Sequence, residues 1–359
     1  MNQLSSQPPQ LKTVYVGLSG GVDSSVAAYL LKQQGYHVVG AYMKNWTQDL
    51  AGNRCPWEDD LRSAKSVAAH LDIELKIFDL QDEYKQLVVD VMVAAYSVGL
   101  TPNPDVLCNQ EIKFRLFYDL CRSDGADFVA TGHYAQLKDG KLMMAVDQHK
   151  DQTYFLYRMP QAAAQQVLFP LGALEKPVVR QIAKTAGLPT ASRPDSMGLC
   201  FVGKIPLKDF LSEFMELKPG DIVSESGDII GQHNGAALYT IGQRHGLGVG
   251  GGTPFYVLSK DLLKNQVTVT ASPDILKRLS YDIEAPVWWQ EPQKGQEYQV
   301  RIRHLGELLP CTIQALSDQE SGGETWRISL IGDAHRGVAA GQHAVLYSGR
   351  AVIGGGVLC

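Results

Sequence analysis

The stretch VYVGLSGGVDSSVAAYLL, residues 14–31, decides the fold class of this chain. Residues 14–18 are apolar and predict a buried strand, and the apolar spacing after Asp23 predicts an amphipathic helix. Between the two, Gly20 and Gly21 allow the backbone to turn tightly and to approach an anion. The start of the helix adds free N–H groups and the positive end of its dipole. The unit therefore predicts an oxyanion site; the alternative is a glycine turn followed by a simple helix cap.

Strands and helices continue to alternate through the first half of the chain. The expected strands are HVVGAYM (37–43), ELKIFDL (74–80) and DFVATGHYA (127–135), and the expected helices cover residues 23–34, 58–70, 82–96 and 112–124. This rhythm predicts an α/β fold with a parallel sheet and helices on both of its faces. The stretch GLTPNPDVLCNQ, residues 99–110, is rich in Pro and Asn and is expected to be a loop.

Short strands replace long helices after about residue 205. GDIVSESGDIIGQH, residues 220–233, predicts a hairpin with Ser-Gly-Asp at its turn, and the glycine-rich residues 246–259 predict an exposed loop. Closely spaced strands after residue 281 predict a small antiparallel barrel. We therefore expect three domains: an α/β domain at 1–205, a small central β domain at 206–280, and a C-terminal β barrel at 281–359.

Composition excludes several classes of protein. Among 359 residues with a net charge of −5, six cysteines are widely spread without a C-x-x-C pair, so neither a disulfide framework nor a zinc site is predicted. No apolar run is long enough to cross a membrane, and the first ten residues have no signal-peptide character. We expect a cytoplasmic protein without a membrane partner. The acidic balance argues mildly against nucleic acid, although a local basic face would suffice to bind it.

The glycine loop lacks the lysine of the Walker pattern, which excludes an ordinary P-loop kinase or GTPase. It resembles instead the PP-loop, SGGxDS, of the N-type ATP pyrophosphatases, which split ATP between its α and β phosphates. This resemblance implies ATP and Mg²⁺, with Asp23 as the likeliest protein neighbour of the metal or, alternatively, only the N-cap of the helix. The implied nucleotide contacts are Gly17, Leu18, Ser19, Gly20, Gly21, Val22, Asp23 and Ser24 around the pyrophosphate, Met43 at the adenosine, and Gly132.

Two cysteines select among the reactions that such loops serve. Cys108 follows Asp105 by three residues, and Cys200 lies in the turn-like segment DSMGLCF. A lone cysteine is more often a small buried hydrophobe. A pair beside an ATP-activating motif indicates sulfur transfer, because a persulfide on one cysteine can attack an adenylated carbon and the second thiolate can then break the S–S bond.

The order of the motifs resembles that of the bacterial tRNA-specific 2-thiouridylases, the MnmA/TrmU family. The matching motifs are GLSGGVDSSV, YMKNW, TPNPDVLCNQEIKF, ATGHYA, KDQTYFLY, LFPLG, DSMGLCFVG, YTIGQRHGLGVGG and GGGV, which span nearly the whole chain. The resemblance implies a PP-loop domain, a central β domain and a C-terminal barrel. It also implies ATP-dependent 2-thiolation of the wobble uridine of tRNA, with sulfur supplied by a cysteine desulfurase or a relay protein.

The resemblance further implies a role for individual residues. Cys200 would carry the persulfide, Cys108 would be its disulfide partner, and Asp105 would be the acid/base. The target base would be lined by Asn103, Pro104 and Asp105, and tRNA would be contacted by His133, Lys150, Asp151, Gln152, Arg303, His304 and Gln342.

Two positions depart from the family pattern. Met197 stands where a hydroxyl residue is usual, and His304 stands where tyrosine is usual, although histidine can still stack on a base. Two other functions remain as alternatives: a different PP-loop synthetase such as an amidating ligase, and a non-catalytic protein that binds tRNA or carries sulfur. The paired cysteines and the intact glycine loop favour the thiouridylase.

Overall fold

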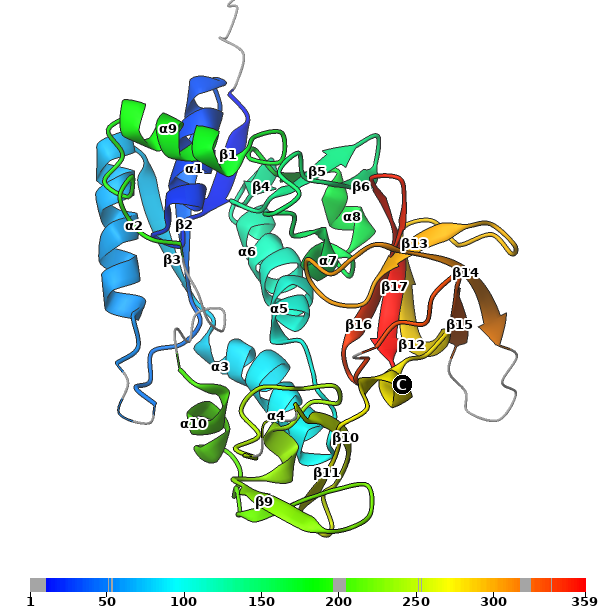
Figure 1. Cartoon of the computed structure of the whole chain (residues 1–359). Coiled ribbons are helices and arrows are strands. Elements are labelled where there is room, and N and C mark those ends of the chain that lie inside the picture. Colours follow the sequence, from blue (N-terminus) through cyan, green and yellow to red (C-terminus); the bar gives the residue numbers. More distant parts are fainter. Residues whose placement is uncertain are drawn as a thin grey trace, which may run out of the picture.

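The computed structural model describes residues 11–50, 52, 54–195, 205–250, 252, 254–316, 324–336 and 338–359. The described chain forms a parallel sheet wrapped by helices, a small central sheet and a barrel, which lie side by side in Figure 1. No helix in these ranges is both long and apolar enough to cross a membrane.

The parallel sheet confirms the α/β prediction. Its strands are β1 (Thr13–Gly17), β2 (His37–Lys44), β3 (Glu74–Asp79), β4 (Phe128–Ala130) and β7 (Val167–Leu168), in the order β3-β2-β1-β4-β7. Every neighbouring pair in this sheet is parallel. The chain runs outward from β1 to β3 and then returns to β4 on the other side of β1. Ligands of such sheets bind outside the carboxyl ends of the strands at this reversal.

Helices cover both faces of this sheet, as predicted. Val14 and Val16 of β1 pack in one core with α1 (Val22–Gln33), α2 (Trp57–Leu71) and α9 (Lys176–Thr185). Tyr15 faces a second core on the opposite side. That core includes residues of α3 (Gln81–Tyr84), a π-helical turn (Lys85–Val89), α4 (Asp90–Ser97), a second π-helical segment (Cys108–Leu116) and α6 (Phe117–Ser123).

The predicted loop at residues 99–110 is only half correct. Helix α5 begins at Pro104 and runs through Leu107 directly into the π-helical segment and α6. The side chain of Asn103 caps this helix by accepting a hydrogen bond from Val106 N at 3.3 Å. Proline at the first helical position is favourable because its φ already suits a helix and no N–H is needed there. Asn-Pro is therefore a helix start here, and Cys108 lies in a helix.

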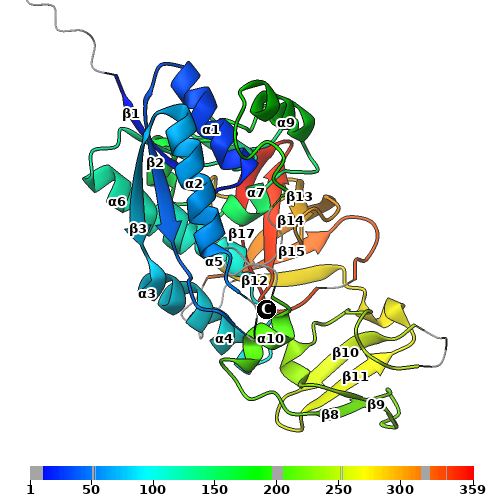
Figure 2. The same ribbon diagram turned by 90° about the vertical axis from the view of Figure 1, so that its left-hand side faces the viewer.

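The central domain contains the predicted hairpin. Strands β8 (Gly220–Val223) and β9 (Ile229–His233) pair antiparallel and join β10 (Tyr256–Asp261) and β11 (Gln266–Thr270) in the order β10-β11-β8-β9. The short helix α10 (Leu207–Ser212) precedes this sheet, and two 3₁₀ turns (Ala236–Leu238 and Pro273–Leu276) flank its later strands. Figure 2 shows the sheet at the lower edge of the molecule, well away from the parallel sheet. The described glycine-rich residues that precede β10 lie outside the strands, but Leu247 is buried in the core beneath them.

The C-terminal strands form the predicted antiparallel barrel. They are β12 (Ser280–Trp288), β13 (Tyr298–Arg301), β14 (Leu309–Leu316), β15 (Thr325–Leu330), β16 (His343–Ser348) and β17 (Ala351–Leu358). The barrel closes because β12 pairs with both β15 and β17. A hairpin from the first half of the chain, β5 (Ala135–Lys138) and β6 (Lys141–Met144), extends the barrel sheet by pairing with β17. The domain boundaries at 205 and 280 stay a prediction.

A buried ion pair joins the barrel to the first half of the chain. Asp151 precedes α7 (Thr153–Leu156), which is followed by α8 (Gln161–Ala164), and its side chain is fully buried. Its carboxylate accepts hydrogen bonds from Ala145 N at 2.9 Å, Thr153 Oγ1 at 2.8 Å and Arg301 Nη1 at 3.0 Å. A buried charge is tolerated only when it is paired and hydrogen-bonded in this way.

We expect Arg301→Met to lower the free energy of unfolding by about 3–5 kcal/mol, because it leaves the Asp151 carboxylate buried without its charged partner. Urea denaturation followed by circular dichroism measures the loss. Arg327→Met is the matched control, since Arg327 pairs with Asp282 at 2.7 Å on the barrel surface, where both side chains are partly exposed. That change should cost less than about 1 kcal/mol. Equal losses in the two variants would contradict the role of the buried pair.

Candidate active site

The glycine loop begins where β1 ends and packs against β2 and α2. Leu18 N donates to Ala41 O of β2 at 2.8 Å and continues the parallel ladder for one residue. Gly20 has a φ of +77°, and a Cβ there would lie 2.5 Å from Asp60 O of α2. Only glycine allows both the left-handed backbone and this close approach. The predicted residues Gly17, Leu18 and Gly20 are buried accordingly.

Serine hydroxyls fix the inside of the loop. Ser24 Oγ and Ser25 Oγ both donate to Gly21 O, at 3.1 and 2.7 Å, and Ser24 Oγ also accepts from Ser19 N at 3.2 Å. Gly21 is the N-cap of α1, which begins at Val22. The loop is therefore shaped by its own hydrogen bonds, while Ser19 stays exposed at its mouth.

Met43 and Gly132, the other two predicted nucleotide contacts, lie against this loop. Met43 lies near the end of β2, and its Cε would be 3.4 Å from a Cβ on Gly17. Gly132 follows β4, and a Cβ there would lie 2.7 Å from Ser24 N and 2.8 Å from the carbonyl carbon of Asp23. The first turn of α1 therefore rests directly against the end of β4. All three segments converge at the carboxyl ends of β1, β2 and β4.

Asp23 is not the N-cap of α1, so that alternative was wrong. Its carboxylate lies in the first turn of the helix and accepts hydrogen bonds from Lys176 Nζ, at 2.7 Å to each oxygen, and from Tyr134 Oη at 3.0 Å. Gly21 is the N-cap instead, because its backbone is extended and its carbonyl accepts the first helical hydrogen bond, from Ser25 N at 3.3 Å.

A network of charged side chains surrounds the loop. Asp195 binds Lys150 Nζ at 2.8 Å and Lys176 Nζ at 2.9 Å, and it also pairs with Arg180. Burial opposes ionisation of Asp195, but hydrogen bonds and charges from Lys150 and Lys176 hold the pKa of this carboxyl well below its ordinary value. Lys150, predicted to contact tRNA, therefore lies in the network beside the loop.

Arg193 contacts the loop on the side of α2. Arg193 Nη1 donates to Gly20 O at 2.7 Å, and the same guanidinium pairs with Asp60. Neither Arg193 nor Lys176 was predicted as a site residue. One feature of the sequence could have identified Lys176. It is the first residue of α9, where the positive end of the helix dipole disfavours a cation, so a lysine there indicates a nearby negative charge.

Cys108 lies at the start of the π-helical segment and is fully buried. Asp105 precedes it by three residues in a continuous helical stretch, so the two side chains share one face. Asp105 Oδ1 is buried without a hydrogen-bond partner in the part of the chain that the structure describes. Cys200 and Met197 lie outside the described residues.

His304 brings the barrel to Asp105. Its ring lies 4.2 Å from the ring of Phe155, measured between centroids, and burial lowers the pKa of His304 while the charges of Asp151 and Asp105 act against that shift. His304 Nδ1 is buried without a partner among the described residues. Asn109, which sequence reasoning did not single out, donates from Nδ2 to Phe155 O at 3.3 Å, and its Oδ1 is likewise unpaired. Unpaired buried polar atoms thus gather around Phe155.

Gln342 holds the segment that leads into this helix. Its Nε2 donates to Thr101 O at 2.7 Å, and Thr101 N donates to Ala340 O at 2.9 Å. Thr101 Oγ1 also lies 3.4 Å from Thr240 Oγ1 of the central domain. The predicted tRNA contact Gln342 therefore uses its amide to fix the backbone just before Asn103.

The remaining predicted tRNA contacts differ in exposure. His133 is buried, with Nδ1 hydrogen-bonded to Thr131 Oγ1 at 2.7 Å, and burial followed by the charge of Lys113 lowers its pKa well below the ordinary value. Gln152 Oε1 accepts from Tyr134 N at 2.9 Å. Arg303 is exposed and lines a cavity of about 250 Å³ on the barrel. The side chains of His133, Lys150, Asp151, Gln152 and Gln342 thus all have partners within the protein.

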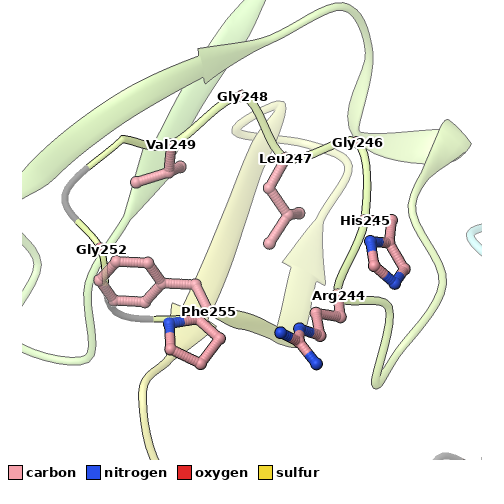
Figure 3. Close-up of a pocket in the computed structure, with 9 residues that line it drawn as sticks. Arg244, His245, Gly246, Leu247, Gly248, Val249, Gly252 and Phe255 are labelled. Carbon is pink, nitrogen blue, oxygen red and sulfur yellow. The ribbon is translucent and has the colours of Figure 1, made fainter.

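A second exposed arginine lies in the central domain. Arg244 and His245 line a cavity of about 400 Å³ together with described glycine, leucine, valine, proline and phenylalanine residues, none of them acidic. Figure 3 shows Arg244 and His245 projecting from one side of this loop, whereas Phe255 lies on the other. Gln243 Nε2 donates to His245 O at 2.9 Å, and buried Leu247 anchors the loop.

Comparison with known proteins places this geometry in a family. Three family models match in order: a tRNA methyl transferase HUP domain at residues 12–204, a tRNA methyl transferase PRC-barrel domain at 208–271, and an aminomethyltransferase beta-barrel domain at 280–358. The tRNA-specific 2-thiouridylase MnmA of Methylobacillus flagellatus is 43% identical over 97% of this chain and 98% of that protein. The MnmA of Escherichia coli strain K12 / DH10B is 42% identical over 97% and 96%. The chain belongs to the MnmA family of tRNA-specific 2-thiouridylases.

Membership of the MnmA family confirms the resemblance seen in the sequence motifs. The family models carry methyl-transfer names, whereas the full-length relatives are named for thiolation. A solved NMN synthetase from Francisella tularensis overlaps 52% of this chain and 67% of its own at 18% identity and a TM-score of 0.34, which is too low to support an argument. The three family models and the observed sheets confirm the predicted fold of a PP-loop α/β domain, a small β domain and a barrel.

We expect Gly132→Ala to weaken ATP binding by between about 10- and 100-fold, because the added methyl group displaces the first turn of α1 from the end of β4. Isothermal titration calorimetry measures the affinity, and a thermal unfolding scan confirms that the variant is folded. Gly250→Ala is the control, since a Cβ there meets nothing within 4 Å. Unchanged ATP affinity in folded Gly132→Ala protein would contradict the close approach.

Proposed function

We propose that this chain is an ATP-dependent tRNA 2-thiouridylase that replaces the C2 oxygen of the wobble uridine with sulfur and releases AMP and pyrophosphate. The observation that carries this proposal is the full-length match to MnmA proteins in all three domains. The geometry supports it, because the glycine loop at residues 17–24, called the anion loop below, and the Asp105–Cys108 helix belong to the same domain. The uridine would enter a site that faces both.

ATP would bind across the carboxyl ends of the parallel strands. The loop from Gly17 to Ser24 would hold the β and γ phosphates at the N-terminus of α1, and Met43 would lie against the adenosine. Among the described residues, no group of three or more His, Cys, Asp or Glu could hold a metal. Mg²⁺ usually binds substrate phosphates with one or two carboxylates, and Asp23 fits that single role. The metal would neutralise phosphate charge.

The first chemical step would activate the base. The C2 oxygen of uridine attacks the α phosphorus, the bond between the α phosphorus and its bridging oxygen breaks, and pyrophosphate leaves. Serine hydroxyls and buried glycines keep the loop in one shape, so no reorganisation is needed when charge develops on the leaving group.

The second step would transfer sulfur. The terminal sulfur of a persulfide on Cys200 attacks C2, and AMP departs with the former C2 oxygen. The Cys108 thiolate then attacks Sγ of Cys200, which leaves sulfur on the base and a disulfide between the cysteines. An external reductant supplies two electrons to reopen it. Asp105 would accept and return the protons, and its unpaired buried oxygen one helical turn from Cys108 supports this role.

The partners follow from this chemistry. A cysteine desulfurase or a sulfur relay protein would load Cys200, and tRNA would be held by exposed cations. Arg303 on the barrel and Arg244 on the central domain are exposed and have no ion pair within the described ranges, unlike Lys150. Asn103 and Pro104 would lie beside the target base, and His304 would be available to stack near it.

The direct test combines the protein with ATP, Mg²⁺, unmodified tRNA, cysteine and a cysteine desulfurase. We expect AMP and pyrophosphate in equal amounts and only when tRNA is present, because the loop lacks the Walker lysine and matches the pyrophosphatase pattern. Mass spectrometry of the digested tRNA should detect 2-thiouridine. ADP and phosphate as the tRNA-dependent products would contradict the proposal, and AMP formation without thiolation would favour another PP-loop synthetase.

The cysteine assignment makes a separate prediction. Cys200→Ser should form no persulfide, because it lacks the sulfur carrier, whereas Cys108→Ser should accept a persulfide on Cys200 but fail to release the sulfur. Both variants should still adenylate the tRNA and release pyrophosphate, because activation of the base precedes the attack by sulfur. Persulfide trapping with mass spectrometry distinguishes the two variants. Cys121→Ser is the control, since Cys121 is buried in the same core as Cys108. Label on Cys108 in Cys200→Ser protein, with none on Cys200 in Cys108→Ser protein, would reverse the two roles.

A further inference from the structure

The anion loop has no lysine of its own, yet a lysine from a distant helix reaches it. Val22 occupies the first helical position after the glycines, and the loop sequence contains no cation. Lys176 opens α9 and places Nζ 2.7 Å from both carboxylate oxygens of Asp23 in the first turn of α1. We propose that Lys176 binds the β and γ phosphates of ATP, in the position that a Walker lysine serves elsewhere; this rests on the proposed use of ATP.

The Lys176 side chain is held in one place before any nucleotide binds. Only 12% of it is exposed, and its ammonium lies between Asp23 and Asp195, at 2.7 and 2.9 Å. The ring of Tyr134 lies 5.7 Å from the same nitrogen, and Lys176 N donates to Asp147 Oδ2 at 2.9 Å. A lysine fixed in this way loses little rotamer freedom when it meets a phosphate.

The position is electrostatically costly without a counter-charge. Lys176 lies in the first turn of α9, whose dipole repels a cation. The carboxylates of Asp23 and Asp195 offset that repulsion. A phosphate oxygen is a similar anionic acceptor, so it can replace Asp23 on the ammonium, and Asp23 is then available to the metal that accompanies the nucleotide.

Three cations and three carboxylates surround the loop on the side of α9. Three cations, Lys150, Lys176 and Arg180, share the two carboxylates Asp23 and Asp195. The second pair at the loop, Arg193 with Asp60, is neutral as a unit. Asp147, which accepts a hydrogen bond from Lys176 N, is the third carboxylate, so this side of the loop is balanced in charge and its cations are ordered before a polyphosphate arrives.

A purely structural role is the competing explanation, in which Lys176 only neutralises two carboxylates. Arg180 offers a matched control because it pairs with the same Asp195 and donates to the backbone carbonyls of Ala191 and Arg193, but has no contact with Asp23. Removing either cation removes an ion pair from the same network. Only the removal of Lys176 takes a cation from beside the anion loop.

The test compares the full-length wild-type protein with Lys176→Met and Arg180→Met, using pyrophosphate with Mg²⁺ and AMP as separate ligands in isothermal titration calorimetry. We expect Lys176→Met to raise the Kd of pyrophosphate by about 10- to 100-fold, as for loss of a charged hydrogen bond. Its Kd for AMP should change by less than about twofold, because AMP lacks the β and γ phosphates. Arg180→Met should alter neither Kd by more than about twofold, and Lys176→Arg should recover part of the pyrophosphate affinity.

The outcomes separate this inference from the proposed function. Pyrophosphate affinity within about twofold of wild type in Lys176→Met overturns it, and so does equal weakening of pyrophosphate and AMP. If Lys176→Met does not fold, Lys176→Gln takes its place and the same limits apply. Wild-type protein that binds neither ligand and forms no AMP with tRNA contradicts the proposed function itself. Wild-type activity with an unaffected Lys176→Met variant contradicts only the role of Lys176.

Discussion

The close approach of two backbones at Gly132 is the constraint on which the site depends. Because this residue has no side chain, the first turn of α1 rests against the end of β4, with the Ser24 amide within 2.7 Å of where a Cβ would be. Gly20 permits a similar contact with α2 on the other side of the loop. The loop is thus held between a strand end and a helix at the point where the strand order reverses.

Contacts between the first half of the chain and the barrel position His304 beside the helix that carries Asp105. Pairing of β6 with β17 and the buried Asp151–Arg301 ion pair fix the barrel against the helical stretch that begins at Pro104. That arrangement brings His304, from the barrel, to the side of Phe155 and close enough for the Asp105 charge to affect its pKa. Asp105 and His304, about two hundred residues apart in the sequence, are thereby brought into electrostatic contact.

Cations gather locally on this chain although its net charge is −5. Near the loop, cations are held by carboxylates, so they are ordered before a ligand arrives and lose little entropy on binding it. On the barrel and the central domain, Arg303 and Arg244 are exposed instead. The first arrangement suits one polyphosphate in a fixed position, and the second suits a large, hydrated RNA backbone.

The sequence by itself determined the parallel sheet, the central hairpin, the barrel and the anion loop, because each depends on local periodicity or on glycine and serine at fixed spacing. It misjudged residues 104–110, since Asn and Pro favour loops as well as helix starts, and only the hydrogen bond from Val106 N to the Asn103 side chain distinguishes the two. The tertiary structure alone decided that Lys150 lies beside the loop, that Asp151 is buried, and that Lys176 reaches Asp23. Those contacts join residues as many as 153 positions apart, and no local pattern encodes them, because an ion pair depends on where two side chains meet and not on their spacing along the chain.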